Sequence, residues 1–86
     1  MENEDLQPVF VSKFLKIYDI THRFKERKTA VYVVTGQTGA ALARILWHGP
    51  WRRYIFEPYH DTIYDSNCLK DIIKFIDELM DKRKNG

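Results

Sequence analysis

The stretch AALARILWHGPWRRYIFEP, residues 40–58, decides the fold, because two apolar and aromatic segments flank a central glycine and proline. β-branched and aromatic residues favour strands, and a glycine between two such segments is typical of a tight connection. We therefore predict a β-hairpin whose strands are Ala40–His48 and Trp51–Glu57.

A two-residue turn at Gly49 and Pro50 fixes which residues face each other across this hairpin. The predicted pairs are His48 with Trp51, Trp47 with Arg52, Ile45 with Tyr54, and Ala43 with Phe56. Because side chains alternate between the two faces of a strand, this register gives one apolar face and one basic and aromatic face. The apolar face carries Ala43, Ile45, Trp47, Tyr54 and Phe56, with Arg52 at its end. The opposite face carries Arg44, Leu46, His48, Trp51, Arg53 and Ile55.

Two further strands are predicted before the hairpin. Residues 29–35, TAVYVVT, are apolar on both parities, which indicates a central strand that is covered on both sides. Gly36 and Gly39 bound the loop that follows, and glycine there permits a positive φ angle. Lys13–Phe24 is rich in aromatic and β-branched residues and is predicted as a strand. Apolar residues at helical spacing also occur in this region, so residues 9–24 stay open between strand and helix.

The clearest element is an amphipathic helix in the last third of the chain. Its apolar residues recur at helical spacing, with charged residues between them. The predicted apolar stripe is Leu69, Ile72, Ile73, Ile76, Leu79 and Met80. Asp65, Ser66 or Asn67 can cap the first turn. We expect the stripe to pack on the apolar face of the hairpin.

These elements predict a single α+β domain over residues 1–86, with a small antiparallel sheet of three to four strands and one C-terminal helix packed on one face. The chain has 86 residues, 44% of them hydrophobic, which suits one core. Thr62–Tyr64 can add a short edge strand. Residues 1–6 and 82–86 are predicted to be flexible.

Charge and cysteine content restrict the class of protein. Fourteen basic and twelve acidic residues give a net charge of +2, too close to balance to identify a nucleic-acid-binding protein. Residues 13–53 hold nine basic and two acidic residues, a net +7. The single Cys68 excludes an internal disulfide, no apolar run can span a membrane, and the start lacks the pattern of a signal peptide. We expect a protein of the reducing interior of a cell, without membrane association.

No group of residues has the spacing of a catalytic or metal site. Glu57, His60 and Asp61 are the densest group of potential metal ligands, but a second cluster that would complete four ligands is missing. Cys68 begins the helix, where the dipole can lower a thiol pKa, but its place beside Leu69 favours packing. We therefore predict no enzyme, no catalytic residue, no cofactor and no metal.

The basic and aromatic face of the hairpin is the candidate binding site. Its predicted binding residues are Arg44, His48, Trp51 and Arg53. Trp and Arg dominate the binding energy of protein interfaces, whereas aromatic and basic side chains on a sheet also stack on bases and contact phosphates. A protein partner is our first prediction and a nucleic acid the alternative, while the third interpretation is a solvated sheet face.

Three motifs follow one another between residues 39 and 76: G-x-x-L-x-x-I-x-W, W-R-x-Y-x-F-x-P and C-L-x-D-I-x-x-F-I. Their residues are Gly39, Leu42, Ile45, Trp47, Trp51, Arg52, Tyr54, Phe56, Pro58, Cys68, Leu69, Asp71, Ile72, Phe75 and Ile76. With these motifs the chain resembles small uncharacterised proteins encoded by bacteriophages and prophages, over residues 30–80. The resemblance implies a phage or mobile-element accessory protein in the cytoplasm of a bacterial cell, and it carries over no catalytic residue.

The predicted function is a non-enzymatic accessory protein of a phage or mobile element that binds a host or phage protein, with inhibition of host defence as one such role. The alternative is a small nucleic-acid-binding module that uses the basic and aromatic face. The sequence leaves the oligomeric state open.

Overall fold

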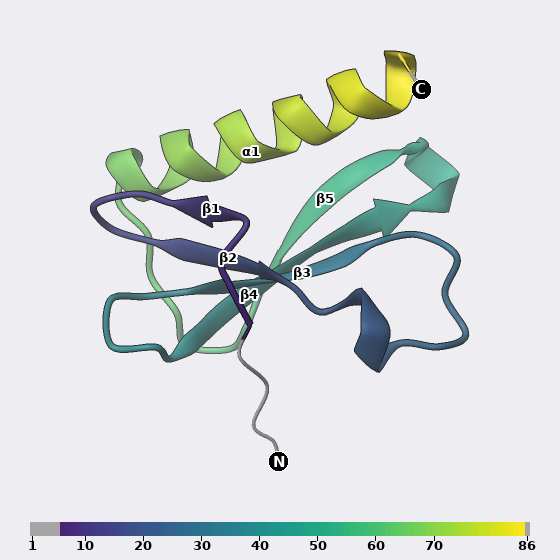
Figure 1. The fold of residues 1–86 in the computed structure, drawn as a ribbon. Coiled ribbons are helices and arrows are strands. Elements are labelled where there is room, and N and C mark those ends of the chain that lie inside the picture. Colours follow the sequence, from purple (N-terminus) through teal and green to yellow (C-terminus); the bar gives the residue numbers. More distant parts are fainter. Residues whose placement is uncertain (1–5, 86) are drawn as a thin grey trace.

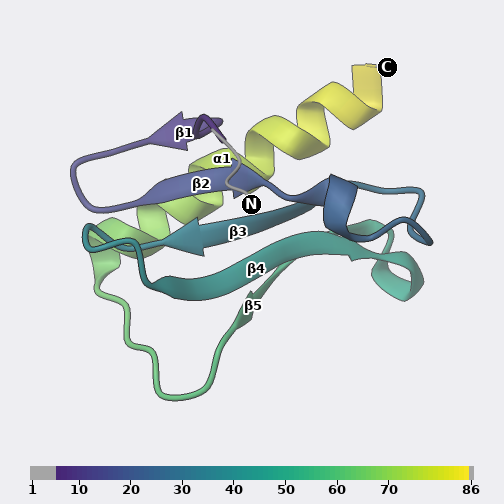
Figure 2. The same ribbon diagram turned by 60° about the horizontal axis from the view of Figure 1, so that its bottom comes forward.

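The computed structural model describes residues 6–85, which form a five-stranded antiparallel sheet and one long α-helix. The strands lie side by side in chain order: β1 (Phe10–Val11), β2 (Lys16–Asp19), β3 (Val31–Thr35), β4 (Ala41–His48) and β5 (Arg53–Pro58). Two 3-10 turns, η1 (Thr21–Arg23) and η2 (Gly49–Trp51), and helix α1 (Ser66–Asn85) complete the order. Helix α1 crosses one face of the sheet (Figure 1), and a view turned by 60° about the horizontal axis shows the strands in front of it (Figure 2).

The predicted α+β class and the single C-terminal helix are confirmed, but the sheet has five strands and not three to four. The additional strand is β1, which pairs with β2 after a tight turn. Ser12 closes this turn, because its Oγ accepts hydrogen bonds from the N–H groups of Phe14 (3.1 Å) and Leu15 (3.0 Å). A strand of two residues is too short to give a periodic signal in sequence.

The predicted strand Lys13–Phe24 is correct only for the four residues of β2. Asp19 ends the strand, because its Oδ1 accepts a hydrogen bond from the N–H of Thr21 at 2.9 Å and turns the chain into η1. The Thr21 hydroxyl in turn accepts a hydrogen bond from the N–H of Val31 (3.0 Å) and fixes the start of β3. Local side-chain hydrogen bonds therefore interrupt a segment of strong strand propensity.

The loop after β3 agrees with the prediction from the sequence, whereas the segment after β5 does not. Gly39 has a φ of 91°, which confirms the positive φ expected in the β3–β4 loop. Thr62–Tyr64 forms no strand. The ring of Tyr64 packs edge-on against Phe56 at 5.1 Å, and its hydroxyl donates to the carbonyl of Leu42 at 2.7 Å. These contacts hold the segment as a loop at the end of the sheet.

The hairpin register differs from the predicted one by two residues. The observed pairs are His48 with Arg53, Trp47 with Tyr54, Ile45 with Phe56, and Ala43 with Pro58. The connection is longer than two residues, because η2 and Arg52, in a left-handed conformation (φ 54°, ψ 51°), join the strands. A shift of two residues preserves the alternation of side chains, so the predicted division into an apolar and a basic face still holds for the strands.

The core lies between α1 and the apolar face of the hairpin, as predicted. Ala43 and Ile45 are fully buried there, together with Ile72, Phe75 and Leu79 of the helix. The predicted stripe was wrong at two positions, since Leu69 and Ile73 are exposed, and it omitted Phe75. Residues 72, 75 and 79 form one narrow stripe at helical spacing, whereas 69 and 73 lie to its side.

Helix α1 begins after an aspartate cap and extends to Asn85. Asp65 is the cap, because its carboxylate accepts a hydrogen bond from the N–H of Cys68 (2.9 Å) and its carbonyl accepts one from the N–H of Leu69 (3.1 Å). The hydrogen bond from Cys68 lowers the pKa of the Asp65 carboxyl. Residues 82–85, for which we predicted flexibility, form the end of α1, while residues 1–5 and 86 lie outside the described residues.

Candidate functional site

By the strand register, Arg44, His48 and Arg53 lie on the face of the sheet opposite α1, called the open face below, and Trp51 lies in η2 at the end of that face. By the strand register, one row of side chains crosses this face from β2 to β5: Tyr18, Val33, Arg44 and Glu57. Leu46 pairs with Ile55 in the next row of β4 and β5, and both are half-buried. Apart from Arg44 and Glu57, these two rows of the open face carry apolar or aromatic side chains.

The guanidinium of Arg44 is bound to the carboxylate of Glu57. The two residues pair directly across β4 and β5, and Arg44 Nε donates to Glu57 Oε1 at 2.9 Å, while Nη2 contacts the same oxygen. The sequence analysis named Glu57 as a strand end and a potential metal ligand but not as a partner of Arg44, because the predicted register placed Ile55 opposite Arg44. The pairing compensates the positive charge that the nucleic-acid alternative requires on this face.

The other three predicted residues meet at the end of the hairpin. His48 pairs with Arg53, and the rings of His48 and Trp51 pack edge-on with centroids 4.9 Å apart. Trp51 lies in η2, where 66% of the residue is exposed. Because most of Trp51 is exposed, its indole presents a large apolar surface to water next to the open face.

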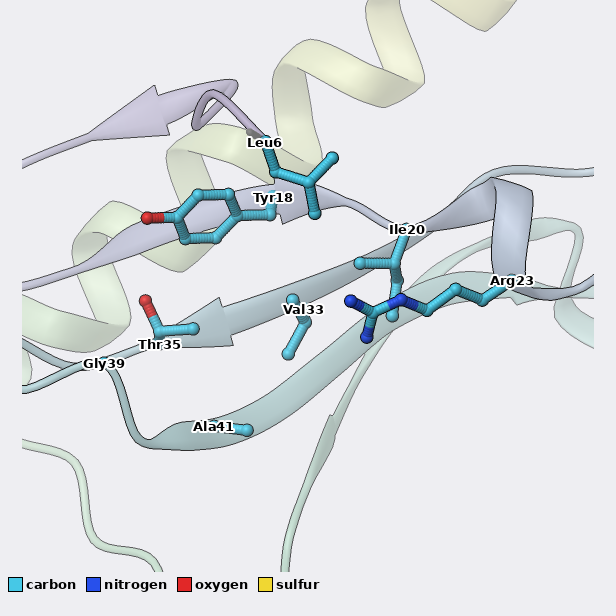
Figure 3. Close-up of a pocket in the computed structure, with 8 residues that line it drawn as sticks. All are labelled: Leu6, Tyr18, Ile20, Arg23, Val33, Thr35, Gly39 and Ala41. Atoms are coloured by element: carbon cyan, nitrogen blue, oxygen red, sulfur yellow. The ribbon is translucent and has the colours of Figure 1, made fainter. Parts of the chain in front are cut away.

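A pocket of about 400 Å³ lies on the part of the open face formed by β2, β3 and β4 (Figure 3). Tyr18, Val33 and Thr35 form its floor, and Leu6 lies over Tyr18 from the segment that precedes β1. The side chain of Arg23 extends from η1 toward Val33. The lining therefore combines apolar side chains with the polar groups of Tyr18, Arg23 and Thr35.

Sequence analysis missed this pocket because its residues come from four separate segments. Strand alternation within Lys16–Asp19 and Val31–Thr35 places Tyr18 and Val33 on the same side, as their observed pairing shows. That signal could be used only once the pairing of β2 with β3 was known.

Two further candidate groups of the sequence analysis are the loop residues around His60 and the cysteine at the start of α1. No cluster of three metal-ligating side chains occurs among residues 6–85. His60 Nε2 lies 3.4 Å from Asp61 Oδ2, but both side chains are almost fully exposed. Burial raises the pKa of the Cys68 thiol, which is the opposite of what a nucleophilic cysteine needs.

Comparison with known proteins places the chain in a class of small phage proteins. An uncharacterized 9.3 kDa protein of Acholeplasma phage L2 is 30% identical over 81 residues, which cover 93% of this chain and 97% of the phage protein. The chain belongs to the same family as this phage protein. No protein-family model matches the chain, and no solved structure gives a significant match. Within the described residues, α1 is too polar to be a membrane-spanning helix.

Proposed function

We propose that the chain is a non-enzymatic phage or mobile-element accessory protein that binds a protein of the host or of the phage through the open face. The observation that carries this proposal is the exposure of Trp51 beside His48, at the end of a sheet face that α1 does not cover. A large, accessible indole next to half-buried apolar side chains has the composition of the centre of a protein interface.

A protein partner suits this face better than a nucleic acid. Phosphate contacts require cations that are free to approach the backbone, whereas Glu57 already compensates the charge of Arg44. Val33, Leu46 and Ile55 offer apolar contact area, and the pocket beside Tyr18 can accept an apolar side chain of the partner.

The phage relative supports a partner inside an infected cell. A protein made from a phage genome meets the proteins of the bacterial cytoplasm and those of the phage, so we propose the cytoplasm as its location. Inhibition of a host defence protein is one form of this function, and it would leave the open face covered by the target.

The proposal is tested by capture and then by direct binding. Tagged full-length protein is incubated with nuclease-treated lysate of the phage-bearing bacterium, and a protein retained by the wild type is purified for calorimetry. We expect Trp51→Ala to weaken binding by about 30-fold, the effect of losing a hot-spot indole of about 2 kcal/mol. Ile63→Ala is the matched control, because Ile63 is 90% exposed in the β5–α1 loop.

The control keeps the test specific to the open face. Binding that survives in Trp51→Ala, or that falls equally in Ile63→Ala, would contradict the proposed site. A partner that is retained only before nuclease treatment would be bound through nucleic acid and would contradict a direct protein interaction. Unchanged melting temperatures of both variants must accompany the comparison, because both side chains are largely in solvent.

A further inference from the structure

A second site lies at the same end of the hairpin but on the side of α1, where β4, the residue that follows η2, β5 and the last turns of α1 border an open cleft of about 510 Å³. This volume lies within the range of roughly 300–1,000 Å³ that is usual for ligand sites. Four cationic side chains line the cleft: Arg52, Arg53, Arg83 and Lys84. Asp77 and Asp81 also line it, so four cations and two carboxylates leave a net charge of +2.

The cations of the cleft are not used by ion pairs within residues 6–85. None of the four forms an ion pair with Asp77, Asp81 or any other carboxylate in that range. Arg83 and Lys84 complement the negative end of the helix dipole. Arg52 and Arg53 belong to the hairpin and bring two more positive charges to the same place.

Arg52 occupies a backbone conformation that does not favour arginine. Its φ of 54° and ψ of 51° lie in the left-handed region, which is sterically unfavourable for a residue with a side chain. Its N–H donates to the carbonyl of Gly49 at 3.0 Å, a bond that glycine or asparagine would make equally well. The turn therefore gives no reason for a guanidinium here, and strained residues of this kind concentrate at functional sites.

Arg83 is held over the cleft by an aromatic side chain. Its guanidinium carbon lies 3.8 Å from the ring centroid of Trp47, and the edge of Tyr54 packs on Trp47 at 5.3 Å. Stacking uses the flat face of the guanidinium and leaves the in-plane N–H donors available for an anion. Such a fork of donors matches the oxygen atoms of a phosphate group.

We propose that this cleft binds the phosphodiester backbone of a nucleic acid. The cations come from two segments and border an open cleft, which suits a chain of phosphates better than one enclosed anion. This inference does not rest on the protein-binding function of the open face, because Arg52 and Arg83 lie outside that face.

The test uses fluorescence anisotropy of a labelled 12-nucleotide single strand with the full-length protein at 50 and 200 mM salt. We expect saturable binding that weakens with salt through counterion release. Arg52→Gly should weaken binding about fivefold and lower the slope of log K against log salt by about 0.7, the value for one lost phosphate contact on a single strand. Its melting temperature should stay equal or rise, because glycine relieves the left-handed strain.

Three comparisons keep the inference falsifiable. Lys25→Gly removes the same charge from an exposed loop position and should leave binding unchanged. Arg52→Asn, which also suits the left-handed conformation, repeats the test if the glycine variant folds poorly. Trp51→Ala should keep the oligonucleotide affinity, which separates this cleft from the open face.

Several results would overturn the assignment. These are absence of saturable binding by the wild type at 50 mM salt, or an equal loss in Arg52→Gly and Lys25→Gly.

Discussion

Arg44 and Glu57 form a cross-strand ion pair at the centre of the open face, with Arg44 Nε 2.9 Å from Glu57 Oε1. The side chain of Arg44 is 30% exposed and that of Glu57 is 46% exposed, so water still reaches both. The Glu57 carboxylate compensates the charge of Arg44, so this guanidinium is less available to contact a phosphate group. The pair therefore favours a protein partner over a nucleic acid on the open face.

We predict that the pair contributes modestly to stability. A double-mutant cycle of Arg44→Ala and Glu57→Ala, followed by urea denaturation, should give a coupling of about 0.2–1 kcal/mol. The coupling should shrink at 1 M salt, because exposed charges are screened. A coupling near zero at low salt would mean that the two side chains do not hold each other in solution.

The helix stripe leads to a prediction about two adjacent isoleucines. Ile72 is 2% exposed in the core, whereas Ile73 is 57% exposed. Ile72→Ala should lower the free energy of unfolding by about 2–5 kcal/mol through lost burial and a cavity. Ile73→Ala should change it by less than about 0.5 kcal/mol. Equal effects in chemical denaturation would show that the helix presents a different side to the sheet.

The raised pKa of Tyr32 leads us to predict a loss of stability at alkaline pH. Desolvation by burial, followed by the nearby Asp19 and Tyr54, raises the pKa of Tyr32 from 10.0 to about 12. The folded state therefore favours the neutral phenol, so its contribution is complete below about pH 10 and is lost as pH rises toward 12. Melting temperatures of the wild type should fall more steeply over this interval than those of Tyr32→Phe.

The phenylalanine variant keeps the ring contacts of this position. The Tyr32 ring packs edge-on against Phe75 at 5.1 Å and Tyr54 at 6.4 Å. Both proteins should hence show the same near-UV spectrum at neutral pH after correction for one phenol. Identical pH profiles for the two proteins would argue against a raised pKa.

Gly39 and Gly49 allow the effect of a positive φ angle to be separated from the effect of steric crowding. A Cβ at either position would meet no atom within 4 Å, but Gly39 alone of the two has a positive φ, 91°. Gly39→Ala should destabilise the protein by about 1–2 kcal/mol through backbone strain. Gly49→Ala should have little effect on the melting temperature, and a comparable loss in both would point to crowding and not to φ.

The sequence determined the features that depend on near neighbours along the chain. Helical spacing from Leu69 to Met80 predicted α1, and alternation within residues 40–58 predicted which side of the hairpin enters the core. Both follow from the repeat of a helix or strand, which needs no knowledge of distant residues. The division into two faces survived the incorrect register, because a shift of two residues keeps every side chain on its side.

Only the tertiary structure decided the features that depend on distant segments. The left-handed Arg52 lengthened the turn, and the resulting register brought Glu57 to Arg44. The pairing of β2 with β3 created the pocket beside Tyr18, and the packing of α1 on the hairpin brought Arg83 over Trp47. These contacts join residues that are 13 to 36 positions apart in the chain, so their partners are set by how the layers pack and not by local propensity.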